Sequence, residues 1–200
     1  MREPFADYIR DKLTPDFLLI ACGLPGTWKT ETTEEVHKIK GGKLLRSDII
    51  RLEVLKNEDI FDTKVAGDMK KRTLVYDVMF EQANEAARSN DNVILDATFV
   101  TQSLRQRAAA IAAKNNKTFV ILQTDCPQEV SIKRILARTR DEYVSNALTE
   151  EAYLNNKKKF EAVDINALKQ ANPGLKVVHL IVDTAKDTPE DWYITGEEKG

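Results

Sequence analysis

The sequence contains few cysteines and histidines, with two of each in 200 residues. Cys22 and Cys126 are too few for a disulfide framework, and they lack the spacing of a metal site. We therefore expect both to be small buried side chains in a protein from a reducing compartment. His37 and His179 have no nucleophile or metal-ligating residue nearby in the sequence, so we interpret both as structural.

The chain also lacks an excess of charge of one sign and a long apolar run. Its 30 basic and 32 acidic residues give a net charge of −2, which disfavours a surface devoted to nucleic acid but allows a local basic cleft. The longest apolar run, residues 17–22, is well short of the ~20 residues that span a bilayer. The N-terminus has no apolar export segment. We therefore expect a cytoplasmic protein that does not enter a membrane.

The composition that is present is typical of a globular protein. Hydrophobic residues make up 42% and charged residues 31%, which excludes a disordered acidic or basic chain. A length of 200 residues fits one domain. We predict a single domain over residues 1–200, with a core at 17–185. We expect the polar tail at 186–200 to be irregular, with Trp192 and Tyr193 as docking anchors.

Five short apolar stretches have the length and composition of buried strands. They cover residues 17–22, 43–46, 92–96, 118–122 and 176–182. Stretches with helical periodicity separate them, at 66–89, 102–113, 131–140 and from Thr149 past Phe160. Strands that alternate with helices predict right-handed crossovers, and therefore an α/β fold with a five-stranded parallel sheet and helices on both faces. A short helix is expected within the first fifteen residues, outside the sheet.

A phosphate-binding motif follows the first apolar stretch. The pattern G-x-x-x-x-G-K-[S/T] between a strand and a helix is matched by Gly23, Lys29 and Thr30. In such a loop the backbone N–H groups surround a phosphate, and the next helix directs its positive end at it. Lys29 would neutralise the β- and γ-phosphates, and the Thr30 hydroxyl would ligate Mg²⁺. The candidate cofactor-binding residues are Gly23, Leu24, Pro25, Gly26, Thr27, Trp28, Lys29 and Thr30, together with Arg134 further along the chain.

Trp28 stands where this motif has its second glycine. Glycine lets the backbone approach the phosphates without a Cβ in the way. A tryptophan here must swing its indole outward or block the loop. An outward indole could stack on the base or on the substrate, whereas a blocked loop would leave a non-catalytic nucleotide- or partner-binding module.

The second apolar stretch leads into Asp48 and Arg51, which share one face of a starting helix. The end of a parallel strand beside a phosphate loop is where α/β proteins bind ligands. There Asp48 would take a proton from an attacking hydroxyl, and Arg51 would hold an anionic substrate group. Alternatively, Asp48 could cap the helix, and Arg51 could pair with Glu53 on a solvated face.

The third stretch ends at Asp96, closely followed by Thr98. A carboxylate at the end of an apolar strand is costly unless it has a partner, and Mg²⁺ through water is the natural one. A capping Asp in a turn is the alternative. We expect Thr98 and Arg105 to face the same cleft, with Thr98 contacting the substrate.

Three arginines, Arg134, Arg138 and Arg140, precede a polar segment at residues 141–146. Phosphoryl transfer depends on positioning and on neutralising charge, so arginines are expected in the cleft. An arginine-rich helix end followed by a loop suits a mobile lid. Each arginine could also lie on an ordinary solvated helix face.

Together these motifs resemble the AAA-domain predicted kinases of the P-loop superfamily. The resemblance covers residues 17 to about 185 and rests on 23–30, 46–51 and 93–99. Asp125-Cys126-Pro127, the arginines that follow, and Phe160-Glu161 fit it too. The group is related to polynucleotide 5′-kinases, gluconate kinases, chloramphenicol phosphotransferases and zeta toxins.

The resemblance implies a P-loop three-layer fold and transfer of the γ-phosphate of ATP to a hydroxyl, with Mg²⁺. By it, Lys29 and Thr30 contact the nucleotide and metal, Asp48 is the general base, and Arg51 binds a substrate phosphate. Arg138, or alternatively Arg134 or Arg140, matches the lid arginine. The acceptor stays open between a small molecule and a nucleic-acid 5′-end, and the near-neutral charge favours the small molecule.

Overall fold

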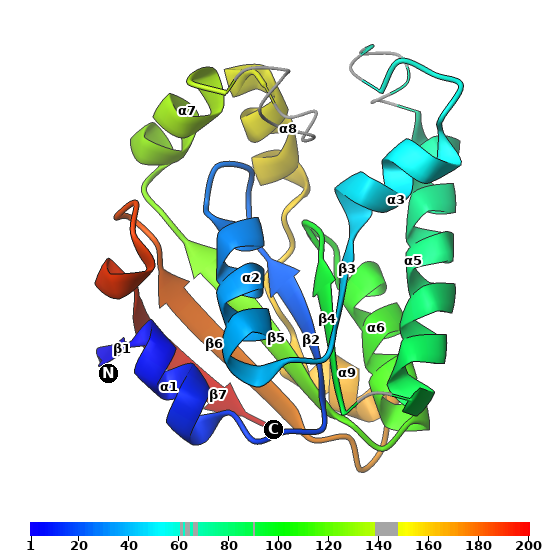
Figure 1. The fold of residues 1–200 in the computed structure, drawn as a ribbon, viewed down its shortest axis with the longest axis vertical. Helices are drawn as coiled ribbons and strands as arrows, with labels where there is room; N and C mark the ends of the chain where they lie inside the picture. Colours follow the sequence, from blue (N-terminus) through cyan, green and yellow to red (C-terminus); the bar gives the residue numbers. More distant parts are fainter. Residues whose placement is uncertain (61, 63–64, 66–67, 90, 139–147) are drawn as a thin grey trace.

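A seven-stranded sheet forms the centre of the computed structural model, which describes every residue except 61, 63–64, 66–67, 90 and 139–147. The strands follow the order β1-β7-β6-β5-β2-β4-β3 (Figure 1). Their bounds are β1 (Glu3–Pro4), β2 (Phe17–Cys22), β3 (Lys43–Arg46), β4 (Asn92–Asp96), β5 (Thr118–Asp125), β6 (Val177–Asp183) and β7 (Tyr193–Lys199). The five predicted strands, β2 to β6, are confirmed, and each is parallel to its neighbour among the five.

Two further strands extend the sheet beyond the predicted five. β7 pairs antiparallel with β6, and β1 pairs antiparallel with β7. The expected irregular tail over residues 186–200 is therefore wrong, although Trp192 is the anchor we expected. Its side chain is 1% exposed and packs edge-on against Phe5, with 6.0 Å between the ring centroids. The pattern missed β7 because a strand with one buried residue, Ile194, alternates only weakly.

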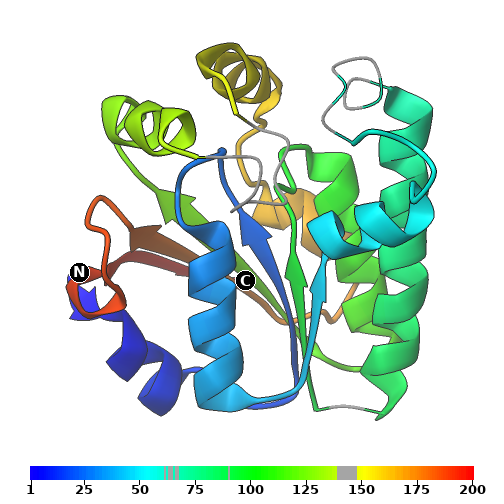
Figure 2. The same cartoon turned by 45° about the horizontal axis from the view of Figure 1, so that its top comes forward.

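Helices cover both faces of the sheet and its carboxyl end. α1 and α2 lie on one face, α3, α5, α6 and α9 lie on the other, and α7 and α8 stand above the carboxyl ends of the strands (Figure 2). The helices are α1 (Phe5–Lys12), α2 (Lys29–Lys40), α3 (Ser47–Val54), α5 (Met69–Ser89), α6 (Gln102–Lys114), α7 (Gln128–Leu136), α8 (Glu150–Lys159) and α9 (Ile165–Ala171), with a 3-10 turn η1 (Pro189–Asp191). The predicted three-layer α/β class is confirmed. Within the described ranges, no helix has the length and apolarity needed to cross a membrane.

The central strand β2 explains how the sheet is buried on both sides. Leu18 and Ile20 belong to the apolar cluster under α5 and α6, whereas Phe17 and Leu19 belong to the cluster under α1 and α2. All six residues of β2 are buried. Alternate side chains thus enter opposite cores, which fixes the register of β2 and the place where its carboxyl end delivers the following loop.

The helix predicted to run from Thr149 past Phe160 is two helices. Thr149 caps α8 as expected, because its hydroxyl accepts a hydrogen bond of 3.1 Å from the Ala152 N–H. α8 ends at Lys159, however, and α9 starts after a second cap, Asp164. The start of the helix predicted at 66–89 lies outside the described residues at 66–67, and α5 is described from Met69 onward.

Arg105 binds the segment between α8 and α9. The sequence predicted that this side chain faces the cleft, and that prediction is wrong. Its side chain is fully buried and donates to the carbonyl oxygens of Glu161 and Ala162, at 2.7 and 3.0 Å. It also donates to the carbonyl of Phe99 at 3.0 Å. Arg105 therefore fastens the extended segment 160–164 to the turn after β4, and it does not face the cleft.

Candidate active site

The loop at residues 23–28 is held in place by two hydroxyl groups and one backbone carbonyl, from residues at the ends of three strands. Thr27 Oγ1 lies 2.6 Å from Thr124 Oγ1 at the end of β5, and Thr184 Oγ1 donates to the Thr27 carbonyl at 3.0 Å after β6. The Gly23 N–H donates to the Thr98 carbonyl at 3.3 Å after β4. The loop is therefore tied to the strands on both sides of β2, which gives its backbone a fixed shape.

Gly26 is required by the close approach of this loop to α7. Its φ is +77°, and a Cβ at this position would lie 2.4 Å from the carbonyl oxygen of Ser131. Any side chain here would push α7 away or reshape the loop. The first glycine of the motif, Gly23, is equally crowded by the Thr124 hydroxyl.

Trp28 adopts the left-handed conformation that glycine would favour, with φ 56° and ψ 34°. Its indole is directed out of the loop and packs partly buried against the cluster under α1 and α2. The guanidinium of Arg134 lies over the ring at 4.7 Å from the centroid. The sequence left open whether the indole turns outward or blocks the loop; its packing against this cluster corresponds to the outward orientation, and its stacking partner is a side chain of the protein itself.

Arg134, predicted to contact the cofactor, is bonded to several protein acceptors. It donates to the carbonyl oxygens of Gly26, Thr184, Ala185 and Lys186 at 3.0–3.3 Å. It also forms an ion pair of 2.8 Å with Asp187, whose pKa it lowers by this hydrogen bond and by its charge. Arg134 therefore joins α7, the phosphate loop and the segment after β6, and acts as a structural connection.

Lys29 begins α2 and folds back over the loop, where its Nζ donates to the Leu24 carbonyl at 2.6 Å. Burial lowers the pKa of Lys29 to about 8, with the charge of Arg138 adding to the effect and Asp96 and Glu31 opposing it. Trp28, which precedes α2, makes no side-chain capping hydrogen bond to the first turn of the helix. Lysine and uncapped amides together make a positive cradle suited to phosphate oxygens.

Thr30 and Asp96 meet across the ends of α2 and β4. The Thr30 hydroxyl donates to Asp96 Oδ2 at 2.7 Å, so Asp96 is not a turn cap. Asp96 is 5% exposed, and burial raises its pKa to about 6. The charge of Asp48 raises it further, whereas Thr30, Lys29 and Arg46 oppose the shift. The positive charges of Lys29 and Arg46 therefore offset only part of the cost of burying the Asp96 carboxylate.

Asp48 and Arg51 pair on the face of α3 that looks toward the loop. Arg51 Nη1 donates to Asp48 Oδ1 at 3.0 Å, and both side chains are mostly buried. α3 starts after Arg46 without a side-chain cap, so Asp48 is not a cap, and Arg51 does not use Glu53. The charge of Asp48 reaches both Lys29 and Asp96, which brings the predicted base beside the phosphate loop.

Arg138 follows α7 and lies near the same group of charges. Its charge lowers the pKa of Lys29 and opposes the burial that raises the pKa of Glu31. Of the candidate lid arginines in the described residues, Arg134 contacts the loop at Gly26, and Arg138 is the one whose charge acts on Lys29. Arg140 and the polar segment 141–146 lie outside the described residues.

Arg72 and Tyr76 were missed by the sequence reasoning. They stand one helical turn apart on α5, and the Tyr76 hydroxyl lies 3.4 Å from Thr98 Oγ1. Burial raises the pKa of Tyr76, while Thr98 and the positive charges of Arg72 and Arg51 act against it. The i, i+4 spacing of an arginine and a tyrosine was the signal available in the sequence, but only the fold shows that they face Arg51.

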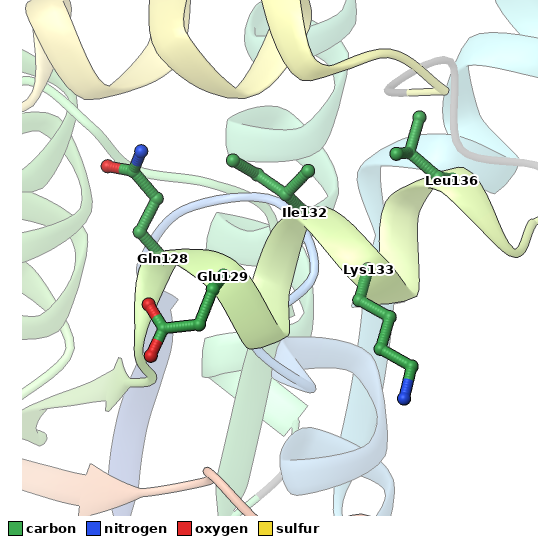
Figure 3. Close-up of a pocket in the computed structure, with 5 residues that line it drawn as sticks. All are labelled: Gln128, Glu129, Ile132, Lys133 and Leu136. Carbon is green, nitrogen blue, oxygen red and sulfur yellow. The ribbon is translucent and has the colours of Figure 1, made fainter.

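A shallow pocket of about 600 Å³ lies apart from these residues, on the outer side of α7. Ile132 and Leu136 point toward α8, and Glu129 and Lys133 point the other way (Figure 3). Its lining contains none of the predicted site residues. The chemistry-bearing side chains gather instead at the carboxyl ends of β2, β3 and β4.

Comparisons with known proteins agree with this geometry. A gluconokinase from Sinorhizobium meliloti 1021 has a TM-score of 0.60 at 14% identity, over 86% of this chain and 85% of that one. A sugar kinase from Janibacter sp. HTCC2649 has a TM-score of 0.61 at 16% identity, over 88% and 89%. Kti12 from Chaetomium thermophilum, in complex with ADP-AlF3, has a TM-score of 0.54 at 18% identity, over 80% and 87%. No curated protein matches the chain at a significant level.

At these identities the solved structures establish the fold alone. A family model described as an AAA domain matches residues 18–163, which is well over half of the chain. The matched range contains the phosphate loop, Asp48, Asp96 and Arg138. The chain therefore belongs to the AAA-domain family, and its fold is that of the P-loop kinases.

Proposed function

We propose that this protein transfers the γ-phosphate of ATP to a hydroxyl group, with Mg²⁺ as cofactor. The observation that carries the proposal is the convergence of three groups at one edge of the sheet: Lys29 on the loop, the Thr30–Asp96 pair and the Asp48–Arg51 pair. A phosphate cradle, a metal-binding pair and a carboxylate base are the parts that phosphoryl transfer requires.

The Thr30–Asp96 pair fits Mg²⁺. Hydroxyl and carboxylate oxygens are ligands that Mg²⁺ accepts, and it commonly takes one or two from the protein and the rest from phosphates and water. The raised pKa of Asp96 also calls for a nearby cation. Within the described residues, no cluster of three or more His, Cys, Asp and Glu forms a dedicated metal cage. When bound, Mg²⁺ would neutralise charge on the phosphate oxygens.

The remaining side chains have separate roles in this proposal. Asp48 accepts the proton of the attacking hydroxyl, and its ion pair with Arg51 fixes the direction of the carboxylate. The ammonium of Lys29 and the guanidinium of Arg138 stabilise the charge on the transferred phosphoryl group. The bond between the γ-phosphorus and its bridging oxygen breaks as the bond to the acceptor oxygen forms, and ADP leaves.

We propose a small molecule with an anionic group as the acceptor. Arg51, Arg72 and Tyr76 lie close enough for the two positive charges to act on the phenol, and Thr98 adds a hydroxyl beside them. Two arginines and two hydroxyls beside the base suit a phosphate or carboxylate next to the reacting hydroxyl. The near-neutral net charge of −2 supports a small acceptor over a long nucleic acid.

The test is ATP-dependent transfer to a panel of anionic alcohols, measured as acceptor-dependent ADP release. Lys29→Ala should abolish binding and turnover, whereas Asp48→Asn should keep ATP binding and lose transfer. Arg107→Met is the matched control, because Arg107 pairs with Asp77 on the far side of α5. The proposal fails if an established transfer activity survives both Lys29→Ala and Asp48→Asn unchanged.

A second candidate function is nucleotide binding without transfer. The observation that favours it is Trp28, whose indole and left-handed backbone stand in place of the motif glycine. This candidate predicts that ATP raises the thermal unfolding midpoint while no acceptor in the panel stimulates ADP release.

A further inference from the structure

The candidate site has two sides, divided by β2. On one side β4 ends at Asp96 and β3 leads into α3, which carries Asp48; these two residues hold the metal-binding and base positions of the proposed function. On the other side β5 and β6 lead to α7 and to the segment 184–187. The phosphate loop follows β2 and lies between the two sides (Figure 1).

This division fixes the direction of a bound triphosphate. The γ-phosphorus must face the acceptor hydroxyl and its base, Asp48, for in-line transfer. The chain of phosphates then runs through the loop and leaves it on the side of β5 and β6. A nucleoside attached to the α-phosphate would therefore lie toward α7 and the segment 184–187.

That side is already filled by Trp28 and Arg134. One face of the indole is covered by the Arg134 guanidinium at 4.7 Å, and the side chain packs into the apolar cluster that includes Val36 and Val182. The guanidinium is held by four carbonyl oxygens and by Asp187. The indole Nε1 is buried without a partner at full hydrogen-bond geometry among the described residues, although its interaction with Asp187 helps to lower the pKa of that carboxyl.

We propose that the Trp28 indole takes the place of a nucleotide base against Arg134, so that this site binds the phosphate chain without recognising the base. The inference rests on the proposed function and names the class of donor: any nucleoside triphosphate, and inorganic tripolyphosphate as well. A base normally contributes affinity through stacking on an aromatic or guanidinium plane. Here the Trp28 indole already stacks on the guanidinium plane of Arg134, so the nucleoside adds little to the binding affinity.

The experiment is isothermal titration of the full chain with ATP, GTP and inorganic tripolyphosphate, each with Mg²⁺. We expect the three dissociation constants of the wild-type protein to agree within about threefold. In Trp28→Gly the plane of Arg134 is uncovered, and glycine accepts the left-handed backbone without strain. ATP should then bind about tenfold more tightly than tripolyphosphate, the gain expected from one stacked base.

Arg107→Met is the control, because Arg107 on α6 pairs with Asp77 on α5, on the face of the sheet opposite to Trp28, and it should keep the wild-type pattern. Wild-type selectivity of tenfold or more for ATP over tripolyphosphate would overturn the inference and leave the proposed function standing. Equal affinities in Trp28→Gly would overturn the role given to the indole. Failure of all three ligands to bind the wild-type protein would overturn both the inference and the proposed function.

Discussion

Lys29 and Asp96 carry opposite charges in the same buried corner, and burial acts against both. It lowers the pKa of Lys29 to about 8 and raises that of Asp96 to about 6. Their mutual attraction offsets only part of this effect. Such opposed pKa shifts are typical of functional sites, because a bound ligand can provide the opposite charges that the buried groups lack in the free protein. Motif spacing identified both residues, but the shifts follow from the packing of α2, β4 and α3 around them.

The first prediction concerns Lys29 and pH. The ammonium must be protonated to bind phosphate, so affinity for ATP should be highest below pH 8 and should fall as the pH rises through about 8. Isothermal titration across this range measures the profile. Lys29→Arg keeps its charge throughout and should give a flat one. A wild-type affinity that stays constant to a clearly alkaline pH would contradict the prediction.

The second prediction concerns the stability cost of Asp96. Its pKa in the folded protein is about 6, above the ordinary 3.8, so the folded state binds the proton more tightly than the unfolded state. The contribution of Asp96 to stability is therefore present at low pH and declines as the pH rises toward 6. Asp96→Asn removes this cost and still accepts the Thr30 hydrogen bond.

Asp96→Asn should raise the midpoint of thermal unfolding at neutral pH, by roughly 2–4 °C for each kcal/mol recovered, and by much less at pH values near the ordinary pKa. It should also lose Mg²⁺-dependent transfer. Calorimetry at the two pH values measures the difference. A variant less stable than the wild-type protein at neutral pH would show that the buried carboxylate is fully compensated.

At the scale of helices and strands, the sequence predicted elements whose signal is local. β2 and β4 are continuous apolar runs, and the loop motif places α2 directly after β2. Elements that depend on distant partners were not predictable in this way. The break between α8 and α9 requires Arg105, which lies more than fifty residues earlier and binds the carbonyls of 161 and 162. β7 needs the exposed edge of β6 and the pocket that receives Trp192.

The third prediction tests whether Trp192 anchors the start of β7. Trp192 is 1% exposed, contacts Phe5 and donates its Nε1–H to the Lys186 carbonyl at 2.9 Å. Trp192→Ala should lower the free energy of unfolding by about 3–5 kcal/mol through loss of apolar contact and the cavity that remains. Tyr193→Ala is the control and should cost less, because Tyr193 is only partly buried. Urea denaturation followed by circular dichroism compares them, and equal losses would refute the anchoring role.

At the scale of the whole molecule, the parallel order of the five central strands brings distant motifs together. Residues 23–30, 46–51 and 96–98 meet because the carboxyl ends of β2, β3 and β4 lie at one edge of the sheet. The rule for parallel sheets predicted this meeting from the sequence. The rule did not predict which side chain covers Trp28. Arg134 lies more than a hundred residues further along the sequence, and most of the acceptors that hold it lie further along still.

The fourth prediction concerns the class of acceptor. A nucleic-acid acceptor would be held by several phosphate contacts, and each contact adds roughly 0.7 to the slope of log affinity against log salt for a single strand. A chain of net charge −2, whose site arginines are largely engaged by Asp48 and by Asp187, has few basic groups to spare for such contacts. We therefore expect a 5′-hydroxyl oligonucleotide to bind no more tightly than its 5′-terminal nucleoside 3′-phosphate. Competition titrations at low and at physiological salt measure both. A steep salt slope for the oligonucleotide alone would instead assign the acceptor to nucleic acid.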